Sequence, residues 1–300
     1  MKLSTRNLIA VLAILAIILV VVQLTKRDNK SKTLKSELVT IDTAKVSKVE
    51  VTSGEEKLTL EKMEGAWTVS TPIGMKAAKS SSINALFSNL ENVKPSRLVA
   101  KREASWPEFK VDSTGTRIKI YEGDKLATDL VVGRFGMEGQ QSFFTYVRLF
   151  EDAEVYLAQD FMGMSINASP RTFRNDVVAQ FTKDSIAQIA FNYPDSSFLL
   201  SREGATWNIN ENAADSSGVA DYLQKLRSVR SSTFLDTEAN LKVTHSIQYS
   251  LFDGTTTTVE ADLSSNTPMI RSSQNSDENF SDNQLVEKLF KGPNAFLATN

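Results

Sequence analysis

The sequence predicts an α+β fold in which a mostly antiparallel unit with one packed helix occurs twice in tandem, preceded by an N-terminal transmembrane helix. The first observation is an internal repeat, since eight residues of the first half match residues of similar type 140 positions later. Seven of the pairs are apolar, and the eighth is basic. They pair Val46, Val49, Val51, Leu58, Leu60, Lys62, Trp67 and Val69 with Ile186, Ile189, Phe191, Phe198, Leu200, Arg202, Trp207 and Ile209. Repetition at a fixed spacing indicates a duplicated architecture.

The second observation is the order of hydrophobic patterns inside the first copy. Apolar residues alternate on both sides of a Gly-containing turn at Ser53–Glu56, which predicts a β-hairpin. A third strand is expected around Trp67 and Val69, and Ser80–Ser82 offer N-caps for a helix. The helix itself is predicted by one apolar stripe with helical spacing, formed by Ile83, Leu86, Phe87, Leu90 and Val93.

The second copy repeats this order with shorter loops. Its helix is predicted by a matching stripe at an offset of 136, formed by Val219, Tyr222, Leu223, Leu226 and Val229. Residues 118–132 and 249–263 then match at an offset of 131, each as two strands around a charged Gly turn. We therefore expect a first unit over residues 38–178 and a second over residues 179–300.

The third observation is an apolar run from Leu8 to Val22, extended to Leu24, which is just long enough to span a bilayer. No small-residue cleavage site follows it, so residues 1–24 are expected to be a signal anchor and residues 25–37 a basic linker. The lysine-rich flank after the run would place the bulk of the chain in the cytoplasm if the positive-inside rule were applied literally. Because large domains cross membranes largely regardless of charge, we expect a single-pass bacterial inner-membrane protein with its bulk in the periplasm.

Several motifs of this chain resemble one bacterial family, the domain of unknown function 4340. They are the stretch Leu60–Val69 around Trp67, then Val131-Val132-Gly133, Tyr146-Val147-Arg148, Val155-Tyr156 and Phe173-Arg174-Asn175-Asp176. The resemblance covers residues 40–180 and, more loosely, 181–290. It implies an anchored envelope protein, often encoded beside components similar to gliding-type ABC transporters. It implies no catalytic residue.

Composition and motifs exclude several classes of function. The chain has 300 residues, a formal net charge of -2 and no cysteine. Nucleic-acid binding would need a basic surplus, and thiolate metal sites or cysteine nucleophiles would need cysteine. Dinucleotide loops, Walker A sequences and Gly-x-Ser-x-Gly elbows do not occur in the sequence. We therefore expect no cofactor and no bound metal.

Two further motifs favour structural interpretations. His245, the one histidine, matches Thr114 of the first copy, so a capping or solvent-facing histidine is expected rather than a triad member. Asp277–Asp282 begins like a calcium loop, but Asp282 stands where that loop has glycine and Lys288 where it has glutamate. A solvated acidic loop is expected there.

The candidate site residues lie near the end of the first unit. Arg171, Arg174 and Asp176 could form an anion- or partner-binding patch, because arginine suits carboxylates and phosphates. The favoured interpretation is structural, with Arg174 paired to Asp176 or to a buried carbonyl so that it fixes the contact between the units. Trp67 and Trp207 are predicted to anchor the cores of the two repeats.

These observations favour a non-enzymatic, membrane-anchored scaffold or accessory protein outside the cytoplasm. Its expected partners are a protein of the cell envelope, such as ABC transporter subunits, and the lipid bilayer through residues 8–24. The alternative is an envelope hydrolase, or a protein that binds carbohydrate or another small ligand, using a cleft between the units. Its candidate acids border the late hairpins and are Asp112, Glu122, Asp253 and Asp262.

Overall fold

The computed structural model describes residues 37–139, 142–182, 184–237 and 240–298. Strands hold 46% of these residues and helices 18%, so the protein is mostly β and the α+β prediction is wrong. The prediction gave the single helix of each unit too much weight. Each of these helices has only 11 residues and accompanies a sheet of eight or nine strands.

The predicted transmembrane helix over residues 8–24 lies outside the described residues. Within the described ranges, no helix combines the length and the hydropathy needed to cross a membrane. The basic linker also lies outside them, apart from its last residue.

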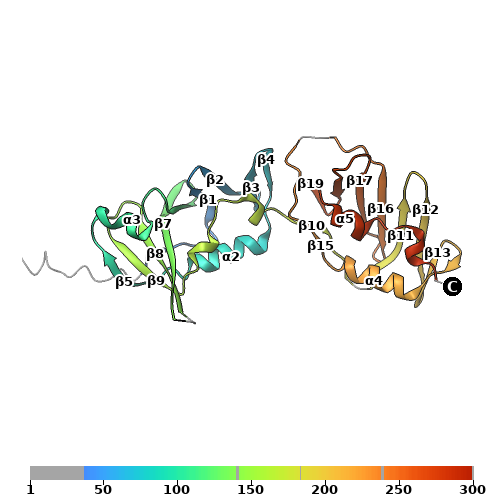
Figure 1. The fold of residues 1–300 in the computed structure, drawn as a ribbon, viewed down its shortest axis with the longest axis horizontal. Coiled ribbons are helices and arrows are strands. Elements are labelled where there is room, and N and C mark those ends of the chain that lie inside the picture. Colours follow the sequence, from blue (N-terminus) through green and yellow to red (C-terminus); the bar gives the residue numbers. More distant parts are fainter. Residues whose placement is uncertain (1–36, 140–141, 183, 238–239, 299–300) are drawn as a thin grey trace, which may run out of the picture. The chain divides into compact units, whose positions relative to one another are not determined.

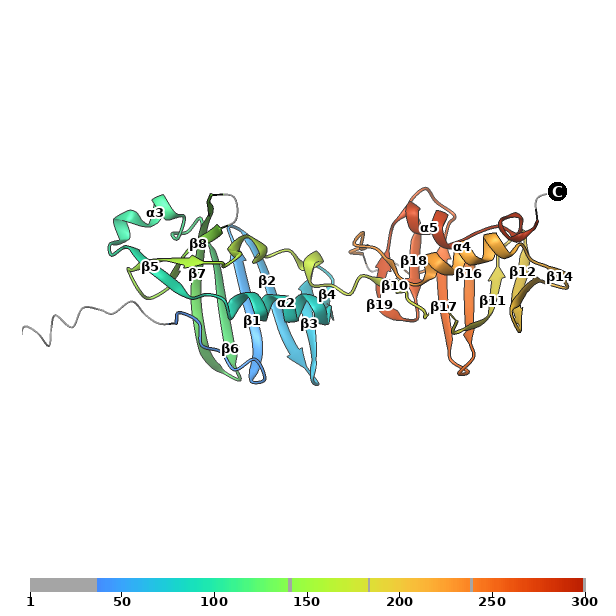
Figure 2. The ribbon, with the colours of Figure 1, turned by 90° about the horizontal axis from the view of Figure 1, so that it is seen from below.

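The first sheet has nine strands, and α2 (Ser80–Leu90) lies across one face of β1 to β3 (Figures 1 and 2). The apolar stripe predicted for this helix is buried. In sheet order the strands are β4 (Gly74–Ala77), β3 (Ala66–Thr71), β2 (Glu56–Met63), β1 (Val46–Ser53), β6 (Thr116–Glu122), β7 (Lys125–Glu138), β8 (Ser142–Leu149), β9 (Val155–Gln159) and β5 (Pro95–Ala100). The short helices of this region are η1 (Glu103–Ser105), α3 (Trp106–Phe109), η2 (Gly163–Ser165) and η3 (Pro170–Thr172).

The second sheet has eight strands, and α4 (Ser216–Leu226) lies against one of its faces (Figures 1 and 2). In sheet order these are β14 (Asn212–Ala213), β13 (Thr206–Ile209), β12 (Ser197–Glu203), β11 (Ile186–Asn192), β16 (His245–Leu251), β17 (Thr256–Asp262), β18 (Met269–Ser272) and β19 (Asn275–Phe280). A separate pair joins β10 (Val177–Ala179) to β15 (Val229–Arg230), and α5 (Asn283–Leu289) and η4 (Pro293–Phe296) follow β19. The core includes the buried rings of Phe191, Tyr222, Tyr249 and Phe296.

Packing divides the chain into two compact units. Of the described residues, the first holds Glu37–Ile41, Asn89–Arg117 and most of Thr128–Ser165. The second holds Asp42–Ser88, Ile118–Ala127 and everything from Ile166 onward. The second unit therefore contains β1 to β4 together with the whole eight-stranded sheet.

Corresponding strands of the two sheets pair in the same register. The pairs are Val49 with Leu60 and Ile189 with Leu200, then Lys62 with Trp67 and Arg202 with Trp207. The order from β4 to β9 also corresponds, strand by strand, to the order from β14 to β19. The edge strand β5 has no counterpart in the eight-stranded sheet.

A Pro-x-x-Phe turn contacts the beginning of the long helix in both regions. The carbonyl of Phe173 accepts the backbone N–H of Lys79 at 2.6 Å, and that of Phe296 accepts the backbone N–H of Asp215 at 2.8 Å. Both phenylalanines are buried, and their turns begin at Pro170 and Pro293. The two Pro-x-x-Phe motifs lie 123 residues apart in the sequence, a signal that could have predicted these turns.

Candidate functional site

Six charged side chains of the second compact unit form two neighbouring ion-pair networks around residues 174–176. We call them the Arg174 cluster, which consists of Lys79, Arg174, Asp176, Arg230, Asp236 and Glu278. They come from the start of α2, the segment after η3, the end of β15, the following loop and β19. Residues far apart in sequence are thereby held together.

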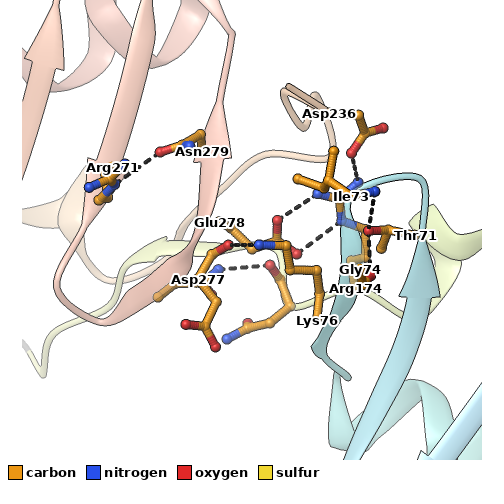
Figure 3. Close-up of polar contacts among 12 residues, drawn as sticks. Thr71, Ile73, Gly74, Lys76, Arg174, Asp236, Arg271, Asp277, Glu278 and Asn279 are labelled. Carbon is orange, nitrogen blue, oxygen red and sulfur yellow. Dashed lines mark hydrogen bonds and ion pairs between the residues drawn. The ribbon is translucent and has the colours of Figure 1, made fainter. Parts of the chain in front are cut away.

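Arg174 is the centre of the first network (Figure 3). Its Nε and Nη2 donate to Glu278 Oε1 and Oε2 at 2.9 and 2.6 Å, and its Nη1 donates to Asp236. The guanidinium carbon lies 3.9 Å from the centre of the Phe234 ring, a cation–π contact. Arg174 is 1% exposed, so the paired carboxylates replace the water that it loses.

Glu278 is buried because β19 turns it inward. Buried residues recur along this strand at Asn275, Glu278 and Phe280, and the Glu278 side chain is fully buried. Burial acts to lower the pKa of Arg174, but hydrogen bonds to Glu278 and Asp236 outweigh it and raise the pKa. The arginine therefore stays charged, and its fork holds β19 to the segment that follows η3.

Asp176 is the centre of the second network. Its carboxylate accepts from Lys79 Nζ at 2.8 Å and from Arg230 Nη1 at 2.6 Å. Burial acts to raise the pKa of Asp176, but the hydrogen bonds from Lys79 and Arg230 outweigh it and lower the pKa. Arg174 thus pairs with Glu278 and Asp236, while Asp176 pairs with two other basic side chains.

Arg171 lies apart from these two residues. It belongs to the last turn of η3, and its side chain is exposed. Of the three predicted site residues, the fold therefore brings Arg174 and Asp176 into the cluster and leaves Arg171 at the surface.

Backbone contacts hold the same segment in place. Asn175 donates its N–H to the Ala77 carbonyl at 3.1 Å, and Ala78 and Arg174 form an isolated β-bridge. Lys76 Nζ donates to the Asp277 carbonyl at 2.7 Å, as Figure 3 shows. Strands β4 and β19 are therefore tied to a common set of neighbours by main-chain and side-chain bonds together.

The two tryptophans sit at equivalent register positions. Trp67 on β3 is half-buried, and its ring centroid lies 5.6 Å from that of Phe87 on α2. Trp207 on β13 is also half-buried and packs against the core of the eight-stranded sheet.

Three of the four carboxylates considered for hydrolysis are engaged in local turns, and the fourth accepts a distant backbone N–H. Asp112 accepts the N–H and hydroxyl of Thr114, Asp253 those of Thr255, and Asp262 those of Ser264, while Glu122 accepts the N–H of Asp42. These hydroxyl bonds are the main cause that lowers the pKa of Asp112, Asp253 and Asp262. A glycosidase general acid needs a raised pKa, so these residues do not suit that role.

His245 lies against aromatic rings. Its centroid is 5.0 Å from that of Tyr193 and 6.2 Å from that of Phe290, and its Nδ1 is 3.0 Å from the Thr244 hydroxyl. Burial lowers the pKa of His245, which favours a neutral ring. Among the described residues, no group of three or more His, Cys, Asp or Glu is arranged to hold a metal.

A second buried arginine, Arg148 on β8, belongs to the first compact unit. Its Nε donates to the Val111 carbonyl at 3.0 Å, its Nη1 reaches three further carbonyls, and its guanidinium lies 3.7 Å from the Trp106 ring centre. Burial lowers the pKa of Arg148. The motif Tyr146-Val147-Arg148 is one of those that resemble the family, and these contacts of Arg148 give it a structural role.

One hollow of the second unit adjoins the Arg174 cluster. It has a volume of about 480 Å³ and is lined by Asn175, Val177, Gln180, Phe181, Thr182 and Gln274. The Gln274 amide accepts the N–H of Gln180 at 2.8 Å and donates to its carbonyl at 3.2 Å, so this wall is fixed. None of the six lining residues is charged, and Val177 and Phe181 are apolar.

Comparison with known proteins gives one family. The model of the family described as Domain of unknown function (DUF4340) matches residues 67–246. Comparison with the curated proteins and with the solved structures gives no match. The family predicted from the motifs is thus confirmed.

Proposed function

Since the chain belongs to the DUF4340 family, we propose that it is a non-enzymatic scaffold or accessory protein that binds a protein partner in the bacterial cell envelope. The observation that carries this proposal is how the charged residues are used. The Arg174 cluster satisfies its charges internally, and three of the four candidate acids cap their own turns. Rigid surfaces, rather than a reactive centre, are what this arrangement provides.

The proposal includes anchoring in the inner membrane through the apolar segment Leu8–Leu24, with the bulk of the chain in the periplasm. The hydropathy and length of that segment support it. A subunit of an ABC-type transporter is the partner that the family resemblance favours.

Crosslinking in intact cells tests the partner. The full chain with a C-terminal tag is crosslinked, extracted from purified membranes and analysed by mass spectrometry. The proposal expects ABC-type transporter subunits at near-stoichiometric yield. Recovery of the protein alone from the membranes would contradict it.

Protease accessibility tests the compartment. In spheroplasts, added protease should degrade the tagged domain while a cytoplasmic marker stays intact. Protection of the tag until the cells are lysed would place the domain on the other side of the membrane and overturn the localisation.

We also infer that the two sheets descend from one duplicated module. Identical registers around Trp67 and Trp207, the shared strand order and the paired Pro-x-x-Phe turns support this inference. An alignment of family members tests it: both halves should keep the matched apolar positions. Halves that diverge independently at those positions in most members would contradict a duplication.

A second candidate function is binding of an uncharged small ligand such as a sugar. The neutral, amide-lined hollow next to β10 favours it, because its volume lies within the range of small-molecule sites. Thermal unfolding with added mono- and disaccharides tests this candidate. The matched variant is Gln180→Ala, which removes one of the lining amides. A melting temperature that no sugar raises would contradict it.

A further inference from the structure

One face of the β7–β8 hairpin is apolar, and residues 161–164 cover only part of it. Thr145 is fully buried there, and its hydroxyl donates to the Phe161 carbonyl at 2.6 Å and accepts the Gly163 N–H at 3.1 Å. A Cβ added to Gly163 would overlap Thr145 and Val132, so the covering segment lies directly on this face. Asn89, at the end of α2, holds that segment through the Met162 carbonyl at 3.1 Å.

Beyond Thr145 the same face continues toward the tip of the hairpin. Phe135 pairs with Thr145 and Met137 pairs with Phe143, so these side chains share one face of the sheet. The Phe135 and Phe143 rings lie 6.0 Å apart. In the covering segment, Met162 and Met164 flank Gly163, the residue that lies against Thr145 on this face. We call these five residues, Phe135, Met137, Phe143, Met162 and Met164, the tip surface.

Three methionines of the tip surface are exposed to solvent. Met164 is 66% exposed, Met137 63% and Met162 43%. Exposed apolar side chains that gather in one place mark interaction sites, and flexible methionines adapt to an irregular apolar partner. A polar solvent-facing tip would have avoided this cost.

The chain outside the described residues indicates what covers this surface. Glu37–Ile41, the first described residues, belong to the same compact unit as the tip surface. A compact body of about 70 residues has a radius of gyration of about 11 Å, so points on its surface lie within about 30 Å of each other. The 12 residues between Leu24 and Glu37 span at most about 40 Å when fully extended.

We propose that the tip surface lies on the lipid bilayer, with its methionines and phenylalanines at the boundary between head groups and acyl chains. This inference rests on the proposed anchoring through Leu8–Leu24. The short tether keeps the first compact unit near the bilayer, and contact with lipid removes the exposed methionines from water. The first compact unit would then be held at a fixed orientation to the membrane.

Site-specific labelling of the full chain tests the proposal. Because the sequence has no cysteine, Met164→Cys creates a single thiol for an environment-sensitive fluorophore. Glu151→Cys is the matched control, since Glu151 is exposed in the same compact unit and follows the end of β8 that lies away from the hairpin tip. In vesicles of phosphatidylethanolamine and phosphatidylglycerol, nitroxide lipids should quench the Met164 label several-fold more than the Glu151 label.

A double substitution separates lipid contact from misfolding. In a chain labelled at Met162→Cys, Met137→Asp and Met164→Asp are introduced together. Both positions are exposed, so the melting temperature should stay near that of the parent while the label at position 162 loses its quenching. Equal quenching at positions 151 and 164 would overturn the proposal, and so would a photocrosslinker at position 164 that captures protein instead of lipid. If the full chain fails to sediment with membranes, the proposed anchoring falls. The tip surface is then judged by quenching when the labelled protein is added to preformed vesicles, and its absence there overturns the proposal.

Discussion

The starts of α2 and α4 share one backbone contact but use different side chains. Lys79 and Asp215, 136 residues apart in the sequence, each donate a backbone N–H to the phenylalanine carbonyl of a Pro-x-x-Phe turn. Asp215 then caps its own helix by accepting from Ser217 and Gly218, as N-cap residues do. Lys79 instead extends to Asp176, outside its helix.

The residues that follow the two turns differ even more. Arg174 follows Phe173 and is 1% exposed within its ion-pair network, whereas Leu297 follows Phe296 and is 42% exposed. Both sheets therefore share the hydrogen bond between the helix start and the Pro-x-x-Phe turn. The side chains around that bond differ, and they determine which distant residues each turn contacts. A local backbone motif and its long-range side-chain partners can thus vary independently.

Removing the charge of Arg174 should have the largest effect. Arg174→Leu leaves Glu278 buried without a partner, which should lower the free energy of unfolding by about 3 to 5 kcal/mol. Urea unfolding followed by circular dichroism measures this. Arg171→Leu, three residues earlier and exposed, should change it by less than about 0.5 kcal/mol. Equal effects of the two variants would contradict the structural role of the Arg174 network.

The starts of α2 and α4 also differ in how closely the neighbouring Pro-x-x-Phe turn packs against the helix. A Cβ at Gly218 would overlap the Ala295 carbonyl oxygen, whereas the matching Ser82 donates its hydroxyl to the Thr172 carbonyl at 2.8 Å. Gly218→Ala should therefore cost about 1 to 3 kcal/mol through overpacking. Ser82→Ala should cost about 1 kcal/mol or less through one lost hydrogen bond. Thermal melts of the two variants compare them, and a harmless Gly218→Ala would show that the turn is loosely packed.

The loss of the first side chain of each helix start should also have different costs, because only Asp215 caps its helix. Asp215→Ala removes two accepted N–H bonds and should lower the free energy of unfolding by about 1 kcal/mol. Lys79→Met removes a partly exposed ion pair and should cost about 0 to 1 kcal/mol. Chemical denaturation of both variants gives the difference. A larger cost for Lys79→Met would mean that the ion pair, not the cap, governs the helix start.

Acid should weaken the Asp176 network. Because the folded-state pKa of Asp176 is lowered, its contribution to stability is present above the unfolded pKa of about 3.9 and is lost as pH falls through the folded value. Asp176→Asn should remove this part of the pH dependence and cost about 1 kcal/mol at neutral pH. Unfolding free energies measured between pH 7 and pH 3 test it. A variant with the same pH slope as the parent would contradict the assignment.

The sequence allowed the locally encoded elements to be predicted. The β1–β2 and β11–β12 hairpins and the two helix stripes follow from spacing alone, because each buries one face. Strand β19 was missed, since Asn275–Phe280 is mostly polar and its Asp277–Asp282 end was interpreted as a solvated loop. Its buried carboxylate, Glu278, is paired with Arg174, which lies 104 residues away in the sequence. A distant ion-pair partner produces no periodic pattern in the sequence. Arg174 could therefore be predicted as a site residue, whereas its partners Glu278 and Asp236 could not.

A double-mutant cycle between Arg174 and Glu278 tests most directly the central claim that the charged site residues serve structure. Each single change to leucine should be strongly destabilising, while the double change should recover much of the loss, because no buried charge is then left unpaired. We predict a coupling energy of at least about 2 kcal/mol in urea unfolding. Effects that add to within about 0.5 kcal/mol would contradict the claim.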